Sequence, residues 1–172
     1  MPKVKRALII LAILATQVGM DQFTKELAIV HIQGRPMTTY LGDTFRFEYA
    51  ENAGAFLSMG AGMSRDYRFW ALTVLVGVVL AGFFVFTVVR ADLGRIRTVA
   101  LSLVVAGGFS NLLDRMFRPG GRVIDFMNMG IGSLRTGIFN YADVIIMVGM
   151  GIYLLSIWLE PETPVPAGGS VQ

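Results

Sequence analysis

Long apolar runs, separated by short polar stretches, dominate the chain and predict helices that cross a membrane. An apolar run begins at residue 7 and, after a polar break, continues to about residue 30. The run over 69–89 contains no charged residue and is long enough to cross a hydrocarbon core about 30 Å thick. Two further segments predict helices over 97–115 and 140–159. The pattern therefore predicts an all-α membrane protein with four transmembrane helices.

The start of the chain has features of a cleavable signal peptide, because basic residues precede a short apolar run. Three more apolar segments follow without an obvious cleavage site, so we expect the first helix to be retained. The same basic residues, with the arginines of the connection 90–97, predict that both termini are cytoplasmic. The outer loops then cover 31–68 and 118–138, although they also contain arginines. We expect a single domain over 1–160 and a disordered tail over 161–172.

The first outer loop contains a stretch with a period of two. Residues 44–50 alternate, with Phe45, Phe47 and Tyr49 on one side and charged residues on the other. This alternation is typical of a half-buried strand. Aromatic rings are favoured at the depth of the lipid headgroups. We therefore expect a small interfacial β-sheet in this loop, lying on the membrane surface.

The composition supports a membrane protein and excludes several kinds of chemistry. Hydrophobic residues make up 54% of the chain and charged residues 16%, whereas soluble domains are about 25% charged. Cysteine is absent and His31 is the single histidine, so we expect no disulfide, no thiol catalysis, no metal and no other cofactor. The basic residues lie at the ends of apolar runs, which favours membrane anchoring over nucleic-acid binding.

Polar side chains gather around the third and fourth apolar segments and need an explanation. An ionisable group at membrane depth costs roughly 2.5–3.5 kcal/mol. Gly107, Asn111, Asp114 and Arg115 recur at intervals of three or four residues, so they share one face of a helix. The glycine would let another backbone approach closely. The charges of Asp114 and Arg115 could satisfy each other, or other partners near the membrane surface.

Two further motifs have structural interpretations beside functional ones. Asp21 and Lys25 are four residues apart in the order that favours a helical ion pair, which would end the first span and fix its depth. Asn52 and Gly54 are typical of a tight turn. The amide of Asn52 could equally bind a substrate backbone, and the sequence alone leaves both interpretations open.

Two aspartates could form a catalytic pair. Asp143 could be the third residue of a helix capped by Asn140, and a helix N-terminus favours its charged form. Asp125 lies in an apolar segment that we expect to be a loop, and apolar surroundings favour its protonated form. Two carboxyls within reach of each other share one proton. Such a pair could activate water and protonate a leaving amine, which is metal-free peptide hydrolysis.

Two other functions remain open at this point. Asp114, Asp125 and Asp143 could form a proton relay in a small transporter, although the chain shows no internal repeat and no pair of broken helices. A non-enzymatic assembly protein would need the polar residues only as caps and anchors. In that case the substitution Asp125→Asn would be silent.

Several segments together resemble bacterial signal peptidase II, the lipoprotein signal peptidase, a four-helix aspartic protease of the membrane. In family order they are DQFTK from Asp21, NAGAF from Asn52, GGFSNLLDR from Gly107, VIDF from Val123 and FNYAD from Phe139. The resemblance implies that Asp125 and Asp143 are the catalytic dyad. It also implies that the predicted strand belongs to the interfacial β-cradle of the family.

The resemblance implies roles for the other polar positions and a substrate. Substrate-binding positions are Asn52, Gly54, Asn111, Arg115 and Asn140, and supporting positions are Asp21, Lys25, Asp114 and, for its close approach, Gly107. The implied reaction removes the signal peptide of a prolipoprotein just before a cysteine that carries diacylglycerol. The expected partners are such prolipoproteins and membrane lipid, without nucleic acid. We expect a monomer in the bacterial cytoplasmic (inner) membrane, with its active site near the outer face.

Overall fold

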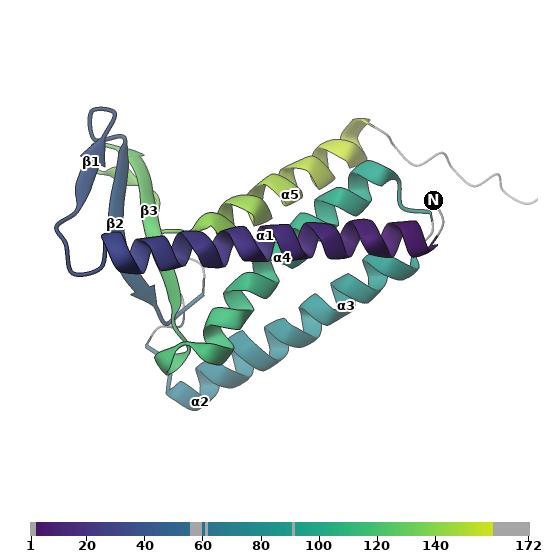
Figure 1. The fold of residues 1–172 in the computed structure, drawn as a ribbon, viewed down its shortest axis with the longest axis horizontal. Helices are drawn as coiled ribbons and strands as arrows, with labels where there is room; N and C mark the ends of the chain where they lie inside the picture. The colour runs from purple at the N-terminus through teal and green to yellow at the C-terminus, as the bar shows by residue number, and fades with distance from the viewer. Residues whose placement is uncertain (1–2, 56–59, 61, 91, 160–172) are drawn as a thin grey trace, which may run out of the picture.

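The computed structural model describes residues 3–55, 60, 62–90 and 92–159, and the tail with predicted disorder lies outside them. A bundle of long helices carries a small sheet at the end opposite the N-terminus (Figure 1). The helices are α1 (Lys3–His31), α2 (Arg65–Arg68), the π-helical η2 (Phe69–Leu75), α3 (Val76–Val89), α4 (Arg95–Phe117), the short 3₁₀ turn η3 (Pro119–Gly121) and α5 (Tyr141–Leu159).

The described residues contain four helices long and apolar enough to span a membrane. They cover Lys3–His31, Arg65–Val89, Arg95–Phe117 and Tyr141–Leu159, which confirms the predicted fold class. The second span begins at Arg65, earlier than predicted, because Ser64 caps it: the Ser64 hydroxyl accepts from the backbone N–H of Tyr67 at 3.5 Å. The chain is therefore a multi-pass membrane protein.

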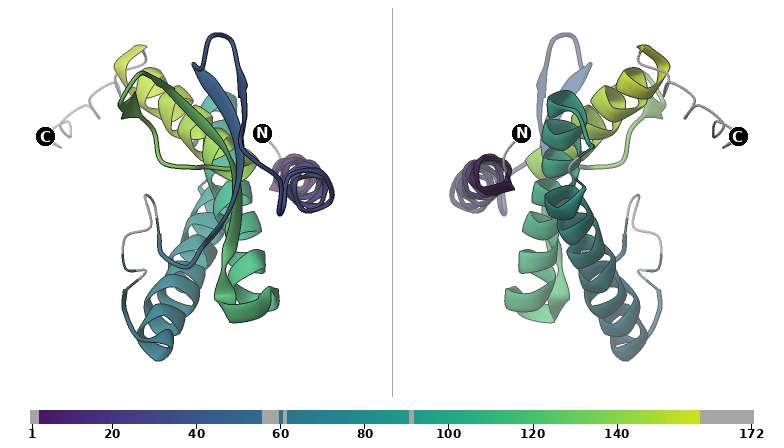
Figure 2. Two further views of the ribbon diagram at one scale, coloured as in Figure 1. Left: turned by 90° about the vertical axis from the view of Figure 1, so that its left-hand side faces the viewer. Right: turned by 90° about the vertical axis from the view of Figure 1, so that its right-hand side faces the viewer.

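The helix α4 is the centre of the bundle. It contacts α1, α3 and α5, and the views along the bundle show these helices arranged around it (Figure 2). Half of its most apolar segment (50%) is buried, whereas the corresponding shares of the other spans lie between 6% and 22%. Large apolar side chains of α3 remain exposed, as expected for a helix surrounded by lipid. The polar face of α4 therefore lies inside the protein.

Two glycines bring the backbones of α4 and α5 together. A Cβ atom on Gly107 would lie 2.5 Å from the carbonyl oxygen of Ala142, and one on Gly149 would lie 2.6 Å from the carbonyl oxygen of Ala100. Any larger residue would force the helices apart. The close contact sets the first turn of α5 against the polar face of α4.

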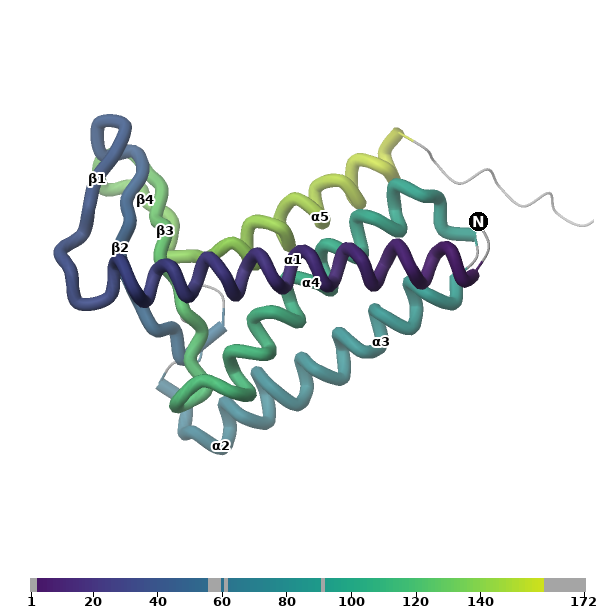
Figure 3. Tube along the Cα trace, viewed as in Figure 1, coloured from purple at the N-terminus to yellow at the C-terminus, as the bar shows by residue number. Residues whose placement is uncertain are grey.

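The sheet combines strands from the loop after α1 and the loop before α5. Its antiparallel order is β1 (Thr38–Tyr40), β2 (Phe45–Asn52), β3 (Val123–Ile131) and β4 (Leu134–Arg135). The predicted strand is present as β2, but the sequence did not predict β3 and β4. Figure 3 shows β3 running beside β2 before the chain enters α5. The expectation that Asp125 lies in a loop was wrong, since Asp125 pairs with Ala50 across β3 and β2.

The aromatic side chains of β2 attach the sheet to the bundle. Phe47 and Tyr49 pack against a buried cluster of Ala28, Ile124 and Phe126, which joins α1 to β3. The pairing of β2 with β3 shifts register between Phe47 and Ala50, as at a β-bulge. The packing fixes β3, and with it Asp125, relative to the helices.

Candidate active site

Asn140 connects Asp125 to Asp143 at the junction of sheet and bundle. Its side-chain Nδ2 donates to Asp125 Oδ1 at 2.7 Å, and its backbone N–H donates to Asp143 Oδ2 at 3.0 Å. Asn140 is fully buried just before α5, so its position is fixed by the packing of α4 against α5. One residue thus orients a carboxyl group of the sheet and a carboxyl group of the bundle.

Asp143 caps α5 and also faces α4. The backbone N–H of Asp143 donates to Asn140 Oδ1 at 3.1 Å, which completes the reciprocal capping arrangement expected from the sequence. The second carboxyl oxygen, Asp143 Oδ1, accepts from Asn111 Nδ2 at 3.0 Å. Asn140 Nδ2 also donates to Asn111 Oδ1 at 3.1 Å. Capping therefore holds the carboxyl group in place and does not exclude a chemical role.

Asp125 is almost completely buried, with 3% of its surface exposed. Its Oδ2 accepts from Asn52 Nδ2 at 3.0 Å, and Asn52 Oδ1 accepts from the backbone N–H of Gly54 at 2.9 Å. Burial raises the pKa of Asp125 to about 7, and the charge of Asp143 adds to the rise, whereas the hydrogen bonds from Asn52 and Asn140 oppose it. Asp125 can thus hold a proton near neutral pH.

The raised pKa of Asp125 predicts a pH-dependent stability. The usual pKa is 3.8 and the pKa in the folded protein is about 7. Between these two pH values the folded state retains a proton that the unfolded chain has released. The contribution of Asp125 to stability is fully present below the unfolded pKa and is lost as the pH rises through about 7. Relative to an Asp125→Asn variant, the wild type should lose roughly 2–3 kcal/mol between pH 5 and pH 8.

Thermal unfolding of both proteins in detergent over this pH range measures the effect. Asp92→Asn is a matched control, because a hydrogen bond from Arg90 lowers the pKa of the exposed Asp92 to about 2, and Asp92 stays charged throughout the range. The difference in stability between Asp92→Asn and the wild type should not change with pH. A constant difference for Asp125→Asn as well would show that the pKa of Asp125 is not raised.

Lys25 lies at the centre of a buried charge cluster, which Asn111 connects to Asp143. Its Nζ is 2.7 Å from Asp21 Oδ2 and 2.7 Å from Asp114 Oδ2, and it donates to Asn111 Oδ1 at 2.9 Å. The predicted ion pair of Asp21 with Lys25 is present, both side chains are fully buried, and α1 continues beyond it to His31. Asp114 of α4 supplies the second carboxylate that keeps this lysine inside the protein.

Asp21 extends this cluster to α5. Its Oδ1 accepts from the backbone N–H of Ala142 at 2.8 Å, and its Oδ2 accepts from the hydroxyl of Ser110 at 2.6 Å. Gln22 Nε2 donates to Ser110 Oγ and to Asp114 Oδ1, each at 3.1 Å. Sequence reasoning missed Ser110 and Gln22. The signal for Ser110 was present, because its helical spacing places it on the polar face of α4.

Asp114 and Arg115 do not pair with each other. Adjacent residues of a helix point about 100° apart, and the two side chains leave α4 in different directions. Asp114 Oδ1 accepts from Arg118 Nε at 2.8 Å, in addition to its contact with Lys25. Arg115 Nη2 instead donates to the carbonyl oxygen of Gly54 at 2.7 Å. The turn after β2 is thereby held against α4.

The structure brings the predicted catalytic and substrate-binding residues into one hydrogen-bonded network. From sheet to bundle the network contains Gly54, Asn52, Asp125, Asn140, Asp143 and Asn111, with Arg115 bound to Gly54. The predicted supporting residues adjoin this network: Asp21, Lys25 and Asp114 form the lysine cluster, and Gly107 lies at the close contact of α4 with α5. The network contains two carboxyl groups, one of which can hold a proton near neutral pH.

Comparison with known proteins identifies the family. The family model for signal peptidase (SPase) II matches residues 12–159. The chain belongs to this family. It is an aspartic peptidase of the membrane, a hydrolase, and the alternatives of a proton-relay transporter and an assembly protein are excluded.

Curated relatives and solved structures agree with the signal peptidase II family. The lipoprotein signal peptidase of Borrelia hermsii (strain HS1 / DAH) is 32% identical over 143 residues, covering 80% of this chain and 82% of the relative. That of Leifsonia xyli subsp. xyli (strain CTCB07) is 38% identical over 158 residues, covering 87% and 67%. A solved bacterial membrane enzyme matches with a TM-score of 0.76 and 21% identity over 94% of both chains, which supports the fold.

Proposed function

We propose that this signal peptidase II removes signal peptides from prolipoproteins with Asp125 and Asp143 as its catalytic dyad. The observation that carries the proposal is the double contact of Asn140, which donates to both carboxyl groups. Carboxyls fixed in this way can share one proton, as an aspartic protease requires. The matched relatives named lipoprotein signal peptidase support the class of substrate.

The two carboxyls have different surroundings and therefore different roles. Asp143 lies in the first turn of α5, where the helix N-terminus favours its charged form, and it accepts a hydrogen bond from the backbone N–H of Asn140, so it is the general base. It removes a proton from water as the water oxygen bonds to the scissile carbonyl carbon. Asp125, protonated near neutral pH, is the general acid. It gives its proton to the leaving amine as the carbon–nitrogen bond breaks, and no covalent enzyme intermediate forms.

The turn after β2 and the amides of α4 form the substrate-binding part of the site. Asn52 shapes this turn through Gly54, and Arg115 holds it against α4. Asn111 and Asn140 bring amide groups to the dyad from the opposite side. These contacts support binding of a substrate backbone between the sheet and the bundle.

The bundle supports an orientation and a position for the lipid of the substrate. We place both termini in the cytoplasm, because basic residues precede the first span and the short connection 90–97 between the second and third spans carries three arginines. The sheet and the dyad then lie at the outer face of the inner membrane. The diacylglycerol of the substrate cysteine would lie in the lipid beside the helices, and cleavage would occur just before that cysteine. A monomer contains every residue of the proposed site.

Asn140→Ala tests the observation that carries this proposal. The change removes the side-chain contacts to Asp125 and Asn111, so the carboxyls lose their common support. We expect kcat for a diacylglyceryl-modified prolipoprotein to fall roughly 10²-fold. Asn128→Ala is the matched control: Asn128 is also buried, but it donates to the carbonyl oxygen of Thr136 within the sheet.

Both variants are checked for folding by their thermal transitions. Asn128→Ala should lower the transition temperature and leave the pH profile of kcat unchanged. Asn140→Ala should lower kcat and alter that profile. Equal kcat values for the two folded variants would remove the support for a dyad oriented by Asn140.

A further inference from the structure

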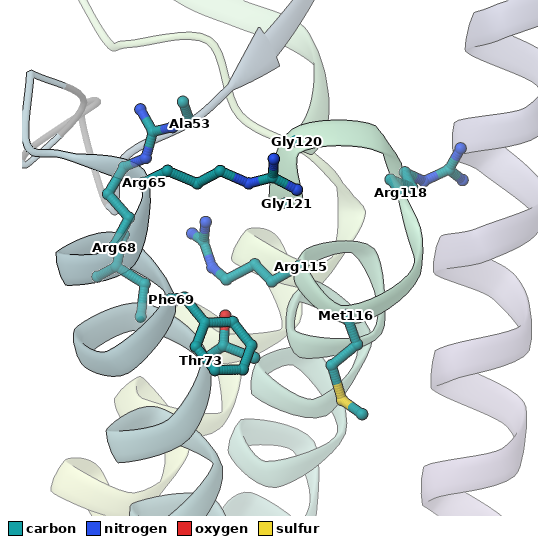
Figure 4. Close-up of a pocket in the computed structure, with 11 residues that line it drawn as sticks. Ala53, Arg65, Arg68, Phe69, Thr73, Arg115, Met116, Arg118, Gly120 and Gly121 are labelled. Atoms are coloured by element: carbon teal, nitrogen blue, oxygen red, sulfur yellow. The ribbon is translucent and has the colours of Figure 1, made fainter.

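A pocket of about 200 Å³ lies beside the proposed active site, between the start of the second span and the end of α4. Arg65, Arg68 and Arg115 line it, and no Asp or Glu does so within the part of the chain that the structure describes. Arg118 borders the pocket as well, but its guanidinium turns away and donates to Glu26 of α1 at 2.9 Å (Figure 4). The pocket therefore concentrates positive charge.

Arg115 contributes a buried donor to this pocket. Figure 4 shows its side chain extending toward those of α2. Its Nη2 donates to the carbonyl oxygen of Gly54, whereas its Nη1 is buried and has no hydrogen-bond partner among the described residues. A buried charged donor without an acceptor is costly. An anion in the pocket would supply the acceptor and reduce the repulsion between the guanidinium groups.

The remaining wall leaves space for a small polar group. Gly120 and Gly121 border the pocket without side chains, and both have positive φ angles, of 71° and 64°. A Cβ atom on Gly121 would lie 3.2 Å from the carbonyl oxygen of Arg115. Thr73 adds a hydroxyl group from η2. Beside the apolar side chains of Phe69, Leu72 and Met116, the lining contains guanidinium groups, a hydroxyl and bare backbone, which suit the phosphate of an amphipathic ligand.

Neighbouring aromatic residues place the pocket at the depth of the lipid headgroups. Tyr67 is 74% exposed and Trp70 is 64% exposed at the start of the second span. Both residue types collect where the hydrocarbon core meets the headgroups. Phe69, between them, lines the pocket. The phosphates of phospholipids lie at this depth.

We propose that this pocket binds the phosphate of an anionic phospholipid, with Arg65, Arg68 and Arg115 as its donors. Guanidinium groups match phosphate oxygens with two parallel hydrogen bonds each. The acyl chains would follow the exposed apolar surface of α3. Because Arg115 also holds Gly54, the phosphate would lie one side chain away from the turn that we assign to substrate binding.

Lipid binding to the purified full-length protein in an uncharged detergent tests this site. Native mass spectrometry would compare phosphatidylglycerol, a diacylglycerol with the same acyl chains, and inorganic phosphate. The variant Arg65→Gln/Arg68→Gln removes two donors and leaves Arg115 in place. Arg35→Gln is the matched control, since Arg35 is exposed in the loop after α1 and does not line the pocket.

The proposal predicts that the wild type and Arg35→Gln retain phosphatidylglycerol equally. The double variant, with an unchanged thermal transition, should bind it at least about tenfold more weakly. Inorganic phosphate should compete weakly and diacylglycerol should not bind the pocket. Unchanged binding in the double variant, or equal binding of the diacylglycerol, would overturn the site. If inorganic phosphate displaces the lipid at equal concentration, the phospholipid assignment is wrong.

Discussion

Asn in place of Asp125 or Asp143 is expected to reduce kcat for prolipoprotein cleavage by roughly 10²–10⁴-fold. Asn at 125 cannot give a proton to the leaving amine, and Asn at 143 cannot take one from water. The folds should survive. In particular, the side-chain oxygen of Asn at 143 can still accept from the backbone N–H of Asn140, which now donates to Asp143 at 3.0 Å. The effect therefore separates chemistry from helix capping.

Initial rates on a diacylglyceryl-modified prolipoprotein measure this loss, beside a thermal transition for each variant. Asp66→Asn is the control, because Asp66 is an exposed acid in the first turn of α2 and belongs to no part of the proposed site. Its kcat should match that of the wild type. Full activity in a folded Asp125→Asn or Asp143→Asn variant would refute the dyad.

Lys25→Met is expected to destabilise the protein by about 3–5 kcal/mol, because it leaves the buried carboxylate of Asp21 without its cation and that of Asp114 with Arg118 only. Asp21 and Asp114 each lie 2.7 Å from the lysine nitrogen, with side-chain exposures of 0% and 1%. The change also removes the donor to Asn111, which itself contacts Asp143. The thermal transition should drop strongly, and kcat should fall in the protein that remains folded.

Arg122→Gln provides the matched comparison for a lost charge pair. Arg122 contacts Glu51 at 3.1 Å, but both side chains are exposed, at 52% and 39%, so the pair contributes about 0–1 kcal/mol. A second variant, Lys25→Met/Asp21→Asn, removes the cation together with the carboxylate that depends on it and should be less destabilised than Lys25→Met alone. If Lys25→Met unfolds at the wild-type temperature, the buried cluster does not support the bundle.

The fold was predictable where a local pattern determines it. Runs without charge predict membrane helices because a hydrogen-bonded helix is the simplest way to cross lipid. The alternation in Phe45, Phe47 and Tyr49 predicted β2 for a similar local reason. The strand β3 was missed because its partner lies far away in the sequence: Asp125 pairs with Ala50. The residues of one loop do not indicate that it pairs with a strand in the other loop.

The site was partly predictable from residue types and spacing. The cap formed by Asn140 and Asp143 follows from two residues three positions apart, and the structure contains it. Spacing in the sequence does not predict which partner a long charged side chain contacts. Asp114 and Arg115 are neighbours in sequence, yet one binds Lys25 and the other reaches Gly54, because the packing of other elements supplies those partners.

The products of a single cleavage reaction test the central claim most directly. Purified wild-type protein would be incubated with a diacylglyceryl-modified prolipoprotein and a metal chelator, and both products would be analysed by mass spectrometry. The account predicts a free signal peptide and a protein that begins at the lipid-bearing cysteine, at a rate unaffected by the chelator. Cleavage at another bond, loss of activity with chelator, or equal cleavage of the unmodified substrate would contradict it.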